Sequence, residues 1–561
     1  MLSYLWLIFM PLSLFSQIRI DKQQNFGGYG HDQSVGIIVE KDYILIAGNS
    51  DTTSNGTGQV PSSCIDIPAY QHAWIVKVNY DYEIIDSWCY NMYVKDFLKV
   101  ENIDRNEYYL VGAAGCKACD NTKRNLSVIR INDEGEVIWS SCFGNDDGYY
   151  YTPFGGDLTG DGGCLASGPY YSANCDISNV YGSIDVWIVA MDSLGNMAWE
   201  TTLGTDGIDV LGHVDKSTHG GFHATMQNDP VSDYGSLLPN PKMNMNATWV
   251  KLDDFGNVEW QECYGCNQVP GQSQEATLYK VLDLEDGYLG VGGTTCNTGD
   301  LQGSGWHPGW GSGGTPTFDI WLFRLDNDRN IVWSKCYGGS GLDGGNRIFQ
   351  TSDGGFIMFG GTHSINGDVA SAAHLNLGNP NSGVAWVFRI DANGDLLWER
   401  CLGEEQGGRT VFMDAFQHND REYTVVGDLL CPLNGISGDV NCPNCSITTD
   451  PNNPGGTFDY WILHITDTVD YSTVSIPERP VPEETSIEIY PNPTNNTVCV
   501  VLPAEAEATK MELVNMSGQV VASKTFNGKS SWLEMGNLPQ GMYILRVHNT
   551  EICLTRKVLR N

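Results

Sequence analysis

A segment bounded by two tryptophans recurs along this chain of 561 residues, and this repetition constrains the fold more than any other feature. Residues 187–199 read WIVAMDSLGNMAW, and a half copy of the same pattern ends at Asp467. Short apolar strands alternate in it with turns rich in Asp, Asn and Gly, and the period is about 60 to 70 residues. Such a period is typical of the blades of a β-propeller. Further copies lie at 74–88, 126–139, 249–260, 321–333 and 386–398.

Each copy is expected to hold four strands joined in pairs by tight Asp- and Gly-containing turns. In the stretch 318–361, which we interpret as one blade, the strands are predicted at 320–325, 331–337, 346–350 and 356–361. The repeat supplies seven third strands, but the last copy stops before its fourth strand. Residues 18–28 match the missing strand in spacing. The two chain ends are therefore predicted to complete one blade and to close an all-β, seven-bladed propeller over residues 17–470.

Catalytic motifs are not found in this repeat. Residues 339–344 match GxGxxG, but a dinucleotide site needs a helix after the glycines, and here a strand is expected. The chain has no GxSxG, HExxH or P-loop sequence, so no catalytic residue is predicted. The recurring Asp, Gly turn and Trp resemble the quinoprotein and delta-type repeats of other propellers. Because the Thr before the turn glycine of the quinoprotein pattern is absent, no quinone cofactor is predicted.

The C-terminal part of the chain has a different pattern. A linker rich in Pro and Glu is predicted at 471–486, and short alternating strands broken by Pro, Asn and Gly follow at 487–561. These strands predict a small β-sandwich. The segment resembles the C-terminal sorting domain of bacterial type IX secretion cargo. The resemblance rests on four motifs, in which the informative residues are Tyr490, Pro491, Asn492, Pro493, Gly518, Gly541, Tyr543 and Lys557.

This resemblance implies export, interaction with the type IX secretion machinery, and either release or attachment at the outer cell surface. In agreement, residues 1–16 are apolar and end in small residues, which predicts a signal peptide. No other segment has the ~18 continuous apolar residues of a membrane span, so no transmembrane segment is expected in the mature chain. Asn561 departs from the family by following the usual terminal basic residue. A structural sandwich, such as a carbohydrate-binding module, is the alternative interpretation of the tail.

The charge balance excludes one class of partner. The chain carries 31 basic and 68 acidic residues, a net charge of −37. It therefore lacks the basic surface that nucleic acids and anionic membranes require. The same charge favours binding of cations.

Two groups of residues are predicted to lie on the face that carries the long connections. Asp32, Asp96, Asp209 and Asp343 each follow the same fourth-strand position by seven residues. They are expected to recur around the inner rim, where they could bind calcium or a cationic ligand, or accept backbone N–H bonds at a turn. Trp306 and Trp310 lie among glycines and could stack on sugar rings or fold back over a blade as a local core.

The 17 cysteines indicate an oxidising compartment. Three CxxC pairs are too far apart for a zinc site, and the odd total predicts at least one free thiol. Disulfides are predicted to pin two long loops, as Cys64–Cys89 and Cys296–Cys336.

The leading functional hypothesis is a non-catalytic recognition or adhesion module with a glycan or a surface protein as ligand. The alternative is a polysaccharide-active hydrolase or lyase with its site on the long-loop face. A structural component of a surface layer is a third possibility.

Overall fold

The computed structural model describes residues 17–560, and the chain divides into two compact units, 1–469 and 470–561. Most gaps in this description fall in connections between strands. The residues not described are 1–16, 29, 52–58, 62–63, 65–71, 102–104, 117–119, 145–153, 171–175, 229–235, 237–245, 268–273, 310, 312–314, 373–382, 404–408, 431–435, 442–456, 470, 472–487, 491–493, 495, 515–519, 537, 549–552 and 561.

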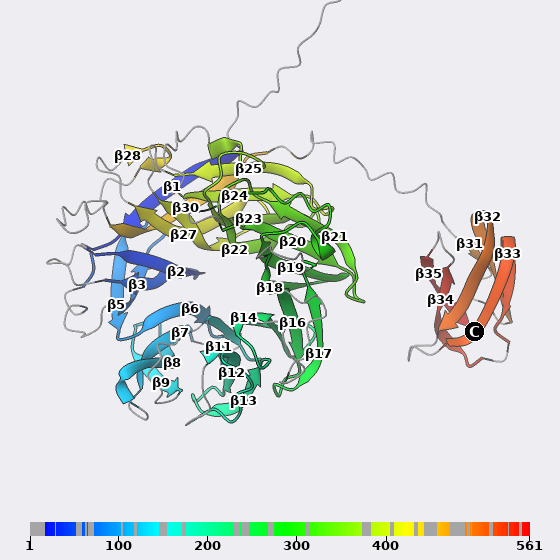
Figure 1. The fold of residues 1–561 in the computed structure, drawn as a ribbon, viewed down its shortest axis with the longest axis horizontal. Helices are drawn as coiled ribbons and strands as arrows, with labels where there is room; N and C mark the ends of the chain where they lie inside the picture. Colours follow the sequence, from blue (N-terminus) through cyan, green and yellow to red (C-terminus); the bar gives the residue numbers. More distant parts are fainter. Residues whose placement is uncertain are drawn as a thin grey trace, which may run out of the picture. The chain divides into compact units, whose positions relative to one another are not determined.

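The first unit is a ring of seven antiparallel four-stranded sheets (Figure 1), and we call the region that its seven innermost strands surround the channel. We number these blades 1 to 7 and give their strands from the channel outward. Blade 1 contains β2 (Asp32–Val39), β3 (Ile44–Ser50), β4 (His72–Val78) and β5 (Ile84–Tyr90). Blade 2 contains β6 (Tyr93–Lys99), β7 (Glu107–Cys116), β8 (Asp120–Asn132) and β9 (Val137–Phe143). Blade 3 contains β10 (Gly155–Leu158), β11 (Cys164–Tyr170), β12 (Asp185–Met191) and β13 (Met197–Leu203).

The next three blades repeat this order. Blade 4 contains β14 (Asp209–Lys216), β15 (Phe222–Asn228), β16 (Asn246–Leu252) and β17 (Val258–Tyr264). Blade 5 contains β18 (Ala276–Leu284), β19 (Gly287–Thr294), β20 (Asp319–Leu325) and β21 (Ile331–Tyr337), with a short 3-10 helix, η2 (Gly299–Leu301), between β19 and β20. Blade 6 contains β22 (Asp343–Gln350), β23 (Phe356–Thr362), β24 (Val384–Ile390) and β25 (Leu396–Leu402).

Blade 7 closes the ring with strands from both ends of the propeller. It contains β26 (Thr410–Gln417), β27 (Glu422–Leu430), β30 (Phe458–Asp467) and, outermost, β1 (Ile18–Phe26). The antiparallel register joins Ile18 to Asp467 and Phe26 to Tyr460. The predicted seven-bladed ring and its closure by the N-terminal strand are therefore confirmed. A small hairpin, β28 (Ile436–Ser437) with β29 (Val440–Asn441), lies in the connection between β27 and β30.

The prediction that residues 318–361 form one blade was wrong. Strands β20 and β21 belong to blade 5, whereas β22 and β23 begin blade 6. The sequence pattern identified the four strands but not where one blade ends, because the chain passes from an outer strand straight to the channel strand of the next blade.

The repeated tryptophans serve two packing roles. Those on third strands, Trp74, Trp249, Trp321, Trp386 and Trp461, are fully buried within the blades. Those on fourth strands lie under the outer hairpin of the following blade. The indole N–H of Trp139 donates to the carbonyl of Ser193 at 3.0 Å, and a Cβ added to Gly195 would lie 2.7 Å from the Trp139 ring. Because Gly195 also has a φ of +84°, only glycine fits this contact between blades without strain.

The second unit is a five-stranded sheet made of β31 (Glu488–Tyr490), β32 (Thr497–Val514), β33 (Val520–Glu534), β34 (Gly541–His548) and β35 (Cys553–Arg560). Register shifts between Val501 and Thr509 divide β32 into two arms, which pair with β31 and with β34 respectively. Both arms contribute to one core, Val498 and Val500 from the first and Met511 and Leu513 from the second. The unit is all-β, as predicted, and it encloses its core by bending a long strand.

Candidate functional site

Several inner strands carry charged residues at one level of the ring. Six of the inner strands have a register shift. In five of these strands the first residue after the shift is equivalent: Gly36, Asp96, Lys280, Arg347 and Asp414. In β14 the shift ends at His213. A β-bulge turns the side chain that follows it and leaves backbone groups unpaired. The repeated bulge thus places acidic and basic residues of different blades around the same section of the channel.

Gly155 of blade 3 lets residues of blades 2 and 4 approach each other. His213 Nε2 on β14 lies 4.0 Å from Asp96 Oδ2 on β6. A Cβ added to Gly155 on the intervening β10 would be 2.9 Å from His213 Nε2 and 3.1 Å from Asp96 Oδ2. The missing side chain therefore leaves the space in which this His–Asp contact forms.

The contacts continue from His213 toward blade 5. His213 Nδ1 lies 3.2 Å from Asp215 Oδ2, and Lys280 Nζ lies 2.5 Å from Asp215 Oδ1. Asp215 is almost fully buried, whereas 28% of the His213 side chain and 33% of the Lys280 side chain are exposed. The cluster thus has one buried carboxylate and two partly exposed basic groups.

Neighbouring charges shift the pKa values of this cluster in opposite directions. Burial opposes ionisation of Asp215, but Lys280 and His213 outweigh it and hold the pKa of that carboxyl well below its usual range. Burial also opposes protonation of His213, yet the charges of Asp215 and Asp96 raise its pKa. In contrast, burial raises the pKa of Asp96 and of Asp157. One cluster therefore contains a strongly acidic carboxyl beside carboxyls shifted toward the neutral form.

Asp96 and Asp414 also hold neighbouring blades together. Asp96 Oδ2 accepts a hydrogen bond from Gly156 N at 3.2 Å, and Asp414 Oδ2 accepts one from Ile37 N at 3.0 Å. In each case the donor lies on the channel strand of the next blade. These carboxylates pair backbone groups along the channel that the sheet itself leaves open.

Three of the four predicted rim aspartates occupy equivalent positions. Asp32, Asp209 and Asp343 begin their strands, are buried, and accept the backbone N–H of the residue four positions earlier at 2.6, 2.6 and 2.9 Å. Each thus closes the turn between two blades. Asp96 does not share this position, and its assignment to the same ring was wrong. Blades 1 and 2 are joined by only residues 91–92, against 204–208 between blades 3 and 4, so Asp96 falls inside β6.

The turn aspartates lie beside a second buried carboxyl at some junctions. Burial raises the pKa of Asp319 to about 8, and the nearby charge of Asp343 adds to this shift. Asp319 Oδ2 accepts hydrogen bonds from His307, while its buried Oδ1 has no partner among the described residues. Within the described part of the chain, no group of three or more His, Cys, Asp or Glu side chains is arranged to hold a metal. Calcium binding by Asp32, Asp96, Asp209 and Asp343 stays a prediction.

We expect Asp319 to make the propeller less stable as pH rises. Its folded pKa of about 8 exceeds the ordinary value of 3.8, so its contribution is complete below about pH 4 and is lost as pH rises through 8. Between pH 5 and pH 8 this loss amounts to about 3 kcal/mol in the free energy of unfolding. In the Asp319→Asn variant, urea titrations at the two pH values should show a smaller loss of stability than in the wild type, because Asp343 and Asp428, whose pKa values are raised to about 6 and about 7, still titrate in this range.

The control for this substitution already exists in blade 4. Asn246 begins β16 as Asp319 begins β20, and its side chain donates to Cys266 O at 3.0 Å and accepts from Cys266 N at 2.8 Å. An asparagine is therefore compatible with this position of the repeat. An Asp319→Asn protein that loses stability with pH as steeply as the wild type would contradict the role of Asp319.

Trp306 is not the exposed platform that its glycine-rich surroundings suggested. It is half-buried and packs against a core cluster that contains Trp321 and Phe323. The backbone around it is fixed by Cys336 N, which donates to Ser304 O at 2.8 Å. Trp306 thus matches the alternative interpretation of a local core. Trp310 lies outside the described residues, and a role for these tryptophans in binding stays a prediction.

One of the two predicted disulfides is present. Cys64 is bonded to Cys89 within blade 1. The Cys296–Cys336 pairing was wrong, because Cys296 bonds to Cys266, which follows the last strand of blade 4. This bridge joins two blades instead of pinning a loop within one. Cys336 is a buried free thiol 3.1 Å from Ser304 Oγ, in agreement with the expected unpaired cysteine.

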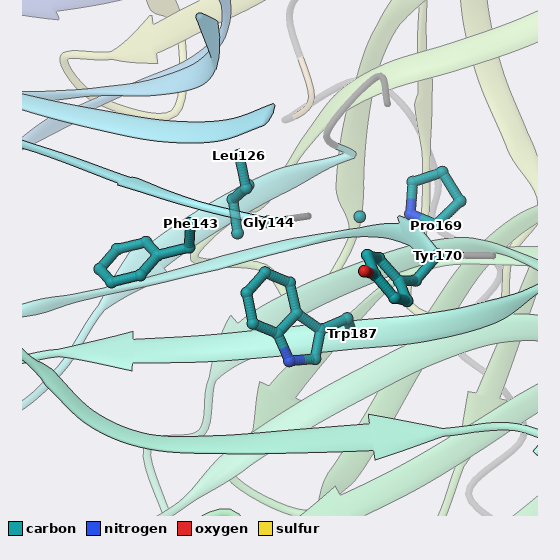
Figure 2. A pocket seen from close by; sticks show the side chains of 7 residues that line it. Leu126, Phe143, Gly144, Pro169, Tyr170 and Trp187 are labelled. Carbon is teal, nitrogen blue, oxygen red and sulfur yellow. The ribbon is translucent and has the colours of Figure 1, made fainter. Parts of the chain in front are cut away.

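A small apolar pocket between blades 2 and 3 is not large enough for a ligand (Figure 2). Leu126 and Phe143 of blade 2 face Pro169, Tyr170 and Trp187 of blade 3 across it. Its cavity volume is about 10 Å³, which holds at most one water molecule.

The residues that predicted the sorting domain fall in several environments. Tyr490 on β31 is about half exposed, and its ring lies edge-on to Trp532 at 6.3 Å. Tyr543 is buried and donates to Pro539 O at 2.6 Å. Gly541 begins β34, and Lys557 lies on β35. Pro491, Asn492, Pro493 and Gly518 lie outside the described residues.

Comparison with known families identifies the C-terminal unit. Residues 488–561 match the family described as a secretion system C-terminal sorting domain, which confirms the prediction from the sequence. The protein is accordingly an exported cargo protein, and the domain implies contact with the secretion machinery. It is a type IX secretion cargo that is secreted or attached to the outer cell surface. No helix of the described residues is long and apolar enough to cross a membrane.

Comparisons over the propeller give no guide to function. No curated protein matches the chain. A puromycin hydrolase structure is 11% identical with a TM-score of 0.39, over 71% of this chain and 50% of that one, so the chain spans about half its length. The α-L-arabinofuranosidase of Fusarium graminearum with arabinobiose is 10% identical with a TM-score of 0.34, over 78% of this chain and 97% of that one. An ulvan lyase is 8% identical with a TM-score of 0.30, over 75% and 85%. These similarities are too low to support an argument about any residue.

Proposed function

We propose that this exported propeller is a recognition module that binds its ligand in the central channel. The observation that carries the proposal is the exposure of basic groups from three adjacent blades, His213, Lys280 and Arg347, at one level of the channel. In a protein with a net charge of −37, such a local concentration of basic groups is a specific feature. Ligand sites combine a concave surface with a few polar groups that are fixed in advance.

The ion pairs around these groups support the proposal because they fix the side chains before a ligand arrives. Asp215 holds both His213 and Lys280, and Asp414 lies 3.4 Å from Arg347 Nε. Ordering long side chains costs conformational entropy, so groups that are already held lose less on binding. A glycan or a surface protein would be bound by hydrogen bonds and charge at this level.

The test is thermal unfolding of the chain without its predicted signal peptide across a panel of glycans. A ligand that binds only the folded state raises the midpoint by mass action, by RT ln(1 + [L]/Kd) in free energy. We expect one glycan class to raise the midpoint of the wild type and not that of Lys280→Met. Lys335→Met is the matched control, because Lys335 is also paired with an aspartate, Asp395, but lies on the outer strand β21. If the glycan raises the unfolding midpoint equally in the two variants, the proposal that the ligand binds in the channel is contradicted.

A polysaccharide-active enzyme is the second candidate function. Asp96 and Asp215 flank His213, and their pKa values are shifted in opposite directions. Pairs of titratable groups whose environments separate their pKa values are typical of a general acid and a general base. Turnover of a glycan by the wild type that falls at least a hundredfold in His213→Gln would favour catalysis over recognition alone.

A further inference from the structure

We infer that the channel recognises an acidic glycan, whose carboxylate or sulfate group binds between Lys280 and Arg347. This inference rests on the proposed function, since it names the ligand class of the same site. Lys280 on β18 and Arg347 on β22 are equivalent residues after the bulges of adjacent blades. Two cations at equivalent positions on neighbouring strands repel each other, and an anion bound between them removes that repulsion.

The environment of Lys280 agrees with this arrangement. Burial opposes its protonated form, and so does the nearby charge of Arg347, but Asp215 raises the pKa of the ammonium group above its usual value. Lys280 therefore keeps its charge although another cation lies close by. Its ammonium group has three N–H donors, and among the described residues it donates to Asp215 alone, which leaves donors for a ligand.

The guanidinium group of Arg347 has unused donors as well. Its Nε lies 3.4 Å from Asp414 Oδ1, and the group lies over the Phe349 ring at 5.1 Å. Within the described residues, neither terminal nitrogen of Arg347 makes a hydrogen bond, and 41% of the side chain is exposed. A planar guanidinium whose two terminal nitrogens are free binds carboxylate and sulfate groups through paired hydrogen bonds.

The acidic residues around the pair do not prevent anion binding. Asp215 and Asp414 are each engaged by the cation that they neutralise. Burial raises the pKa values of Asp96 and Asp157 as well.

The partly exposed aromatic residue that precedes Lys280 in the sequence favours a sugar over a peptide as the bearer of the anion. Tyr279 precedes Lys280 at the bulge, and 36% of it is exposed. Aromatic rings with one exposed face stack on the apolar face of a pyranose, and the adjacent cation would then meet an acidic substituent of that sugar. A uronic acid or a sulfated sugar combines the two features.

The experiment measures binding to the chain without its predicted signal peptide by calorimetry. The probes are a uronic acid oligomer, a sulfated oligosaccharide, a neutral oligosaccharide of equal length, oligoglutamate and inorganic sulfate. We expect an acidic oligosaccharide to bind at least tenfold more tightly than the neutral one, and we expect added salt to weaken this binding. Arg347→Met and Lys280→Met should each reduce its affinity at least tenfold, while Lys335→Met should not.

The outcomes separate this inference from the proposed function. If the neutral oligosaccharide binds tightly and the channel variants lose this binding, the claim that the channel recognises an acidic group is overturned. Recognition of a ligand in the channel would then still stand. If oligoglutamate binds more tightly than any acidic sugar, the claim that the anionic ligand is a glycan is overturned. Failure of every probe would overturn the inference, and binding unchanged in every channel variant would overturn the proposed function as well. Should Arg347→Met fail to fold, Arg347→Lys keeps the charge, loses the paired donors and should still weaken binding.

Discussion

Removal of residues 488–561 should abolish the appearance of the protein outside the cell while leaving the propeller folded. These residues match a secretion sorting domain and form a unit with its own core, so their loss removes the export signal without exposing the core of the propeller. Immunoblots of periplasmic, surface and medium fractions measure the result. We expect the truncated chain in the periplasm and the complete chain at the surface or in the medium.

The converse fusion serves as the control. Residues 487–561, joined to an unrelated periplasmic protein, should direct that protein to the surface or the medium. A smaller change tests the terminal strand, because the Arg560 guanidinium donates to the carbonyls of Leu538 and Gly536. Arg560→Ala should reduce export through loss of this anchor. Unchanged surface display of the truncated chain would contradict the assignment of a sorting function.

Deletion of residues 17–26 should destabilise the propeller by at least about 5 kcal/mol. This segment forms β1, which buries Ile18 and Phe26, and loss of one large core side chain alone typically costs about 2 to 5 kcal/mol. The deletion also leaves β30 as an unpaired edge strand, which favours aggregation. Urea unfolding and light scattering of the truncated propeller measure the two effects.

A circular permutant provides a control with the same strands. Thr468 N donates to Gln17 O at 2.9 Å, so the ends of β30 and β1 are adjacent, and a short turn can join them as in the other six blades. The permutant should begin at residue 28 and carry 17–27 after residue 468. We expect it to recover most of the lost stability. A truncated protein as stable as the wild type would show that β1 does not close the ring.

The sequence predicted the features that repetition determines. The period, the number of blades and the closing strand follow from the tryptophans and the hairpin turns, because equivalent residues meet equivalent neighbours in every blade. The prediction from equal spacing along the sequence was wrong where the connections between blades differ in length. Blades 1 and 2 are joined by residues 91–92 alone, so Asp96 lies within an inner strand and not at the rim. The same limit explains Cys266–Cys296, a bond between blades that a single repeat cannot indicate.

The channel site was missed because its residues come from several blades and share no motif. His213, Lys280 and Arg347 lie in strands of different composition, DVLGHVDK, ATLYKVLDL and DGGNRIFQ, so no common pattern marks them. An alignment of the inner strands alone would have brought them to one position, since each follows the bulge. The role of Gly155 could be recognised only in the structure. Its missing side chain matters because His213 and Asp96 approach each other in the space that a Cβ would fill.

Hydrogen exchange of the inner strands with and without the bound glycan tests the central claim of channel recognition most directly. If the ligand binds at His213, Lys280 and Arg347, amides of β14, β18 and β22 should gain protection, while those of the long connections should change little. Protection confined to the connections between second and third strands, with the inner strands unchanged, would contradict channel recognition and place the ligand on the loop face.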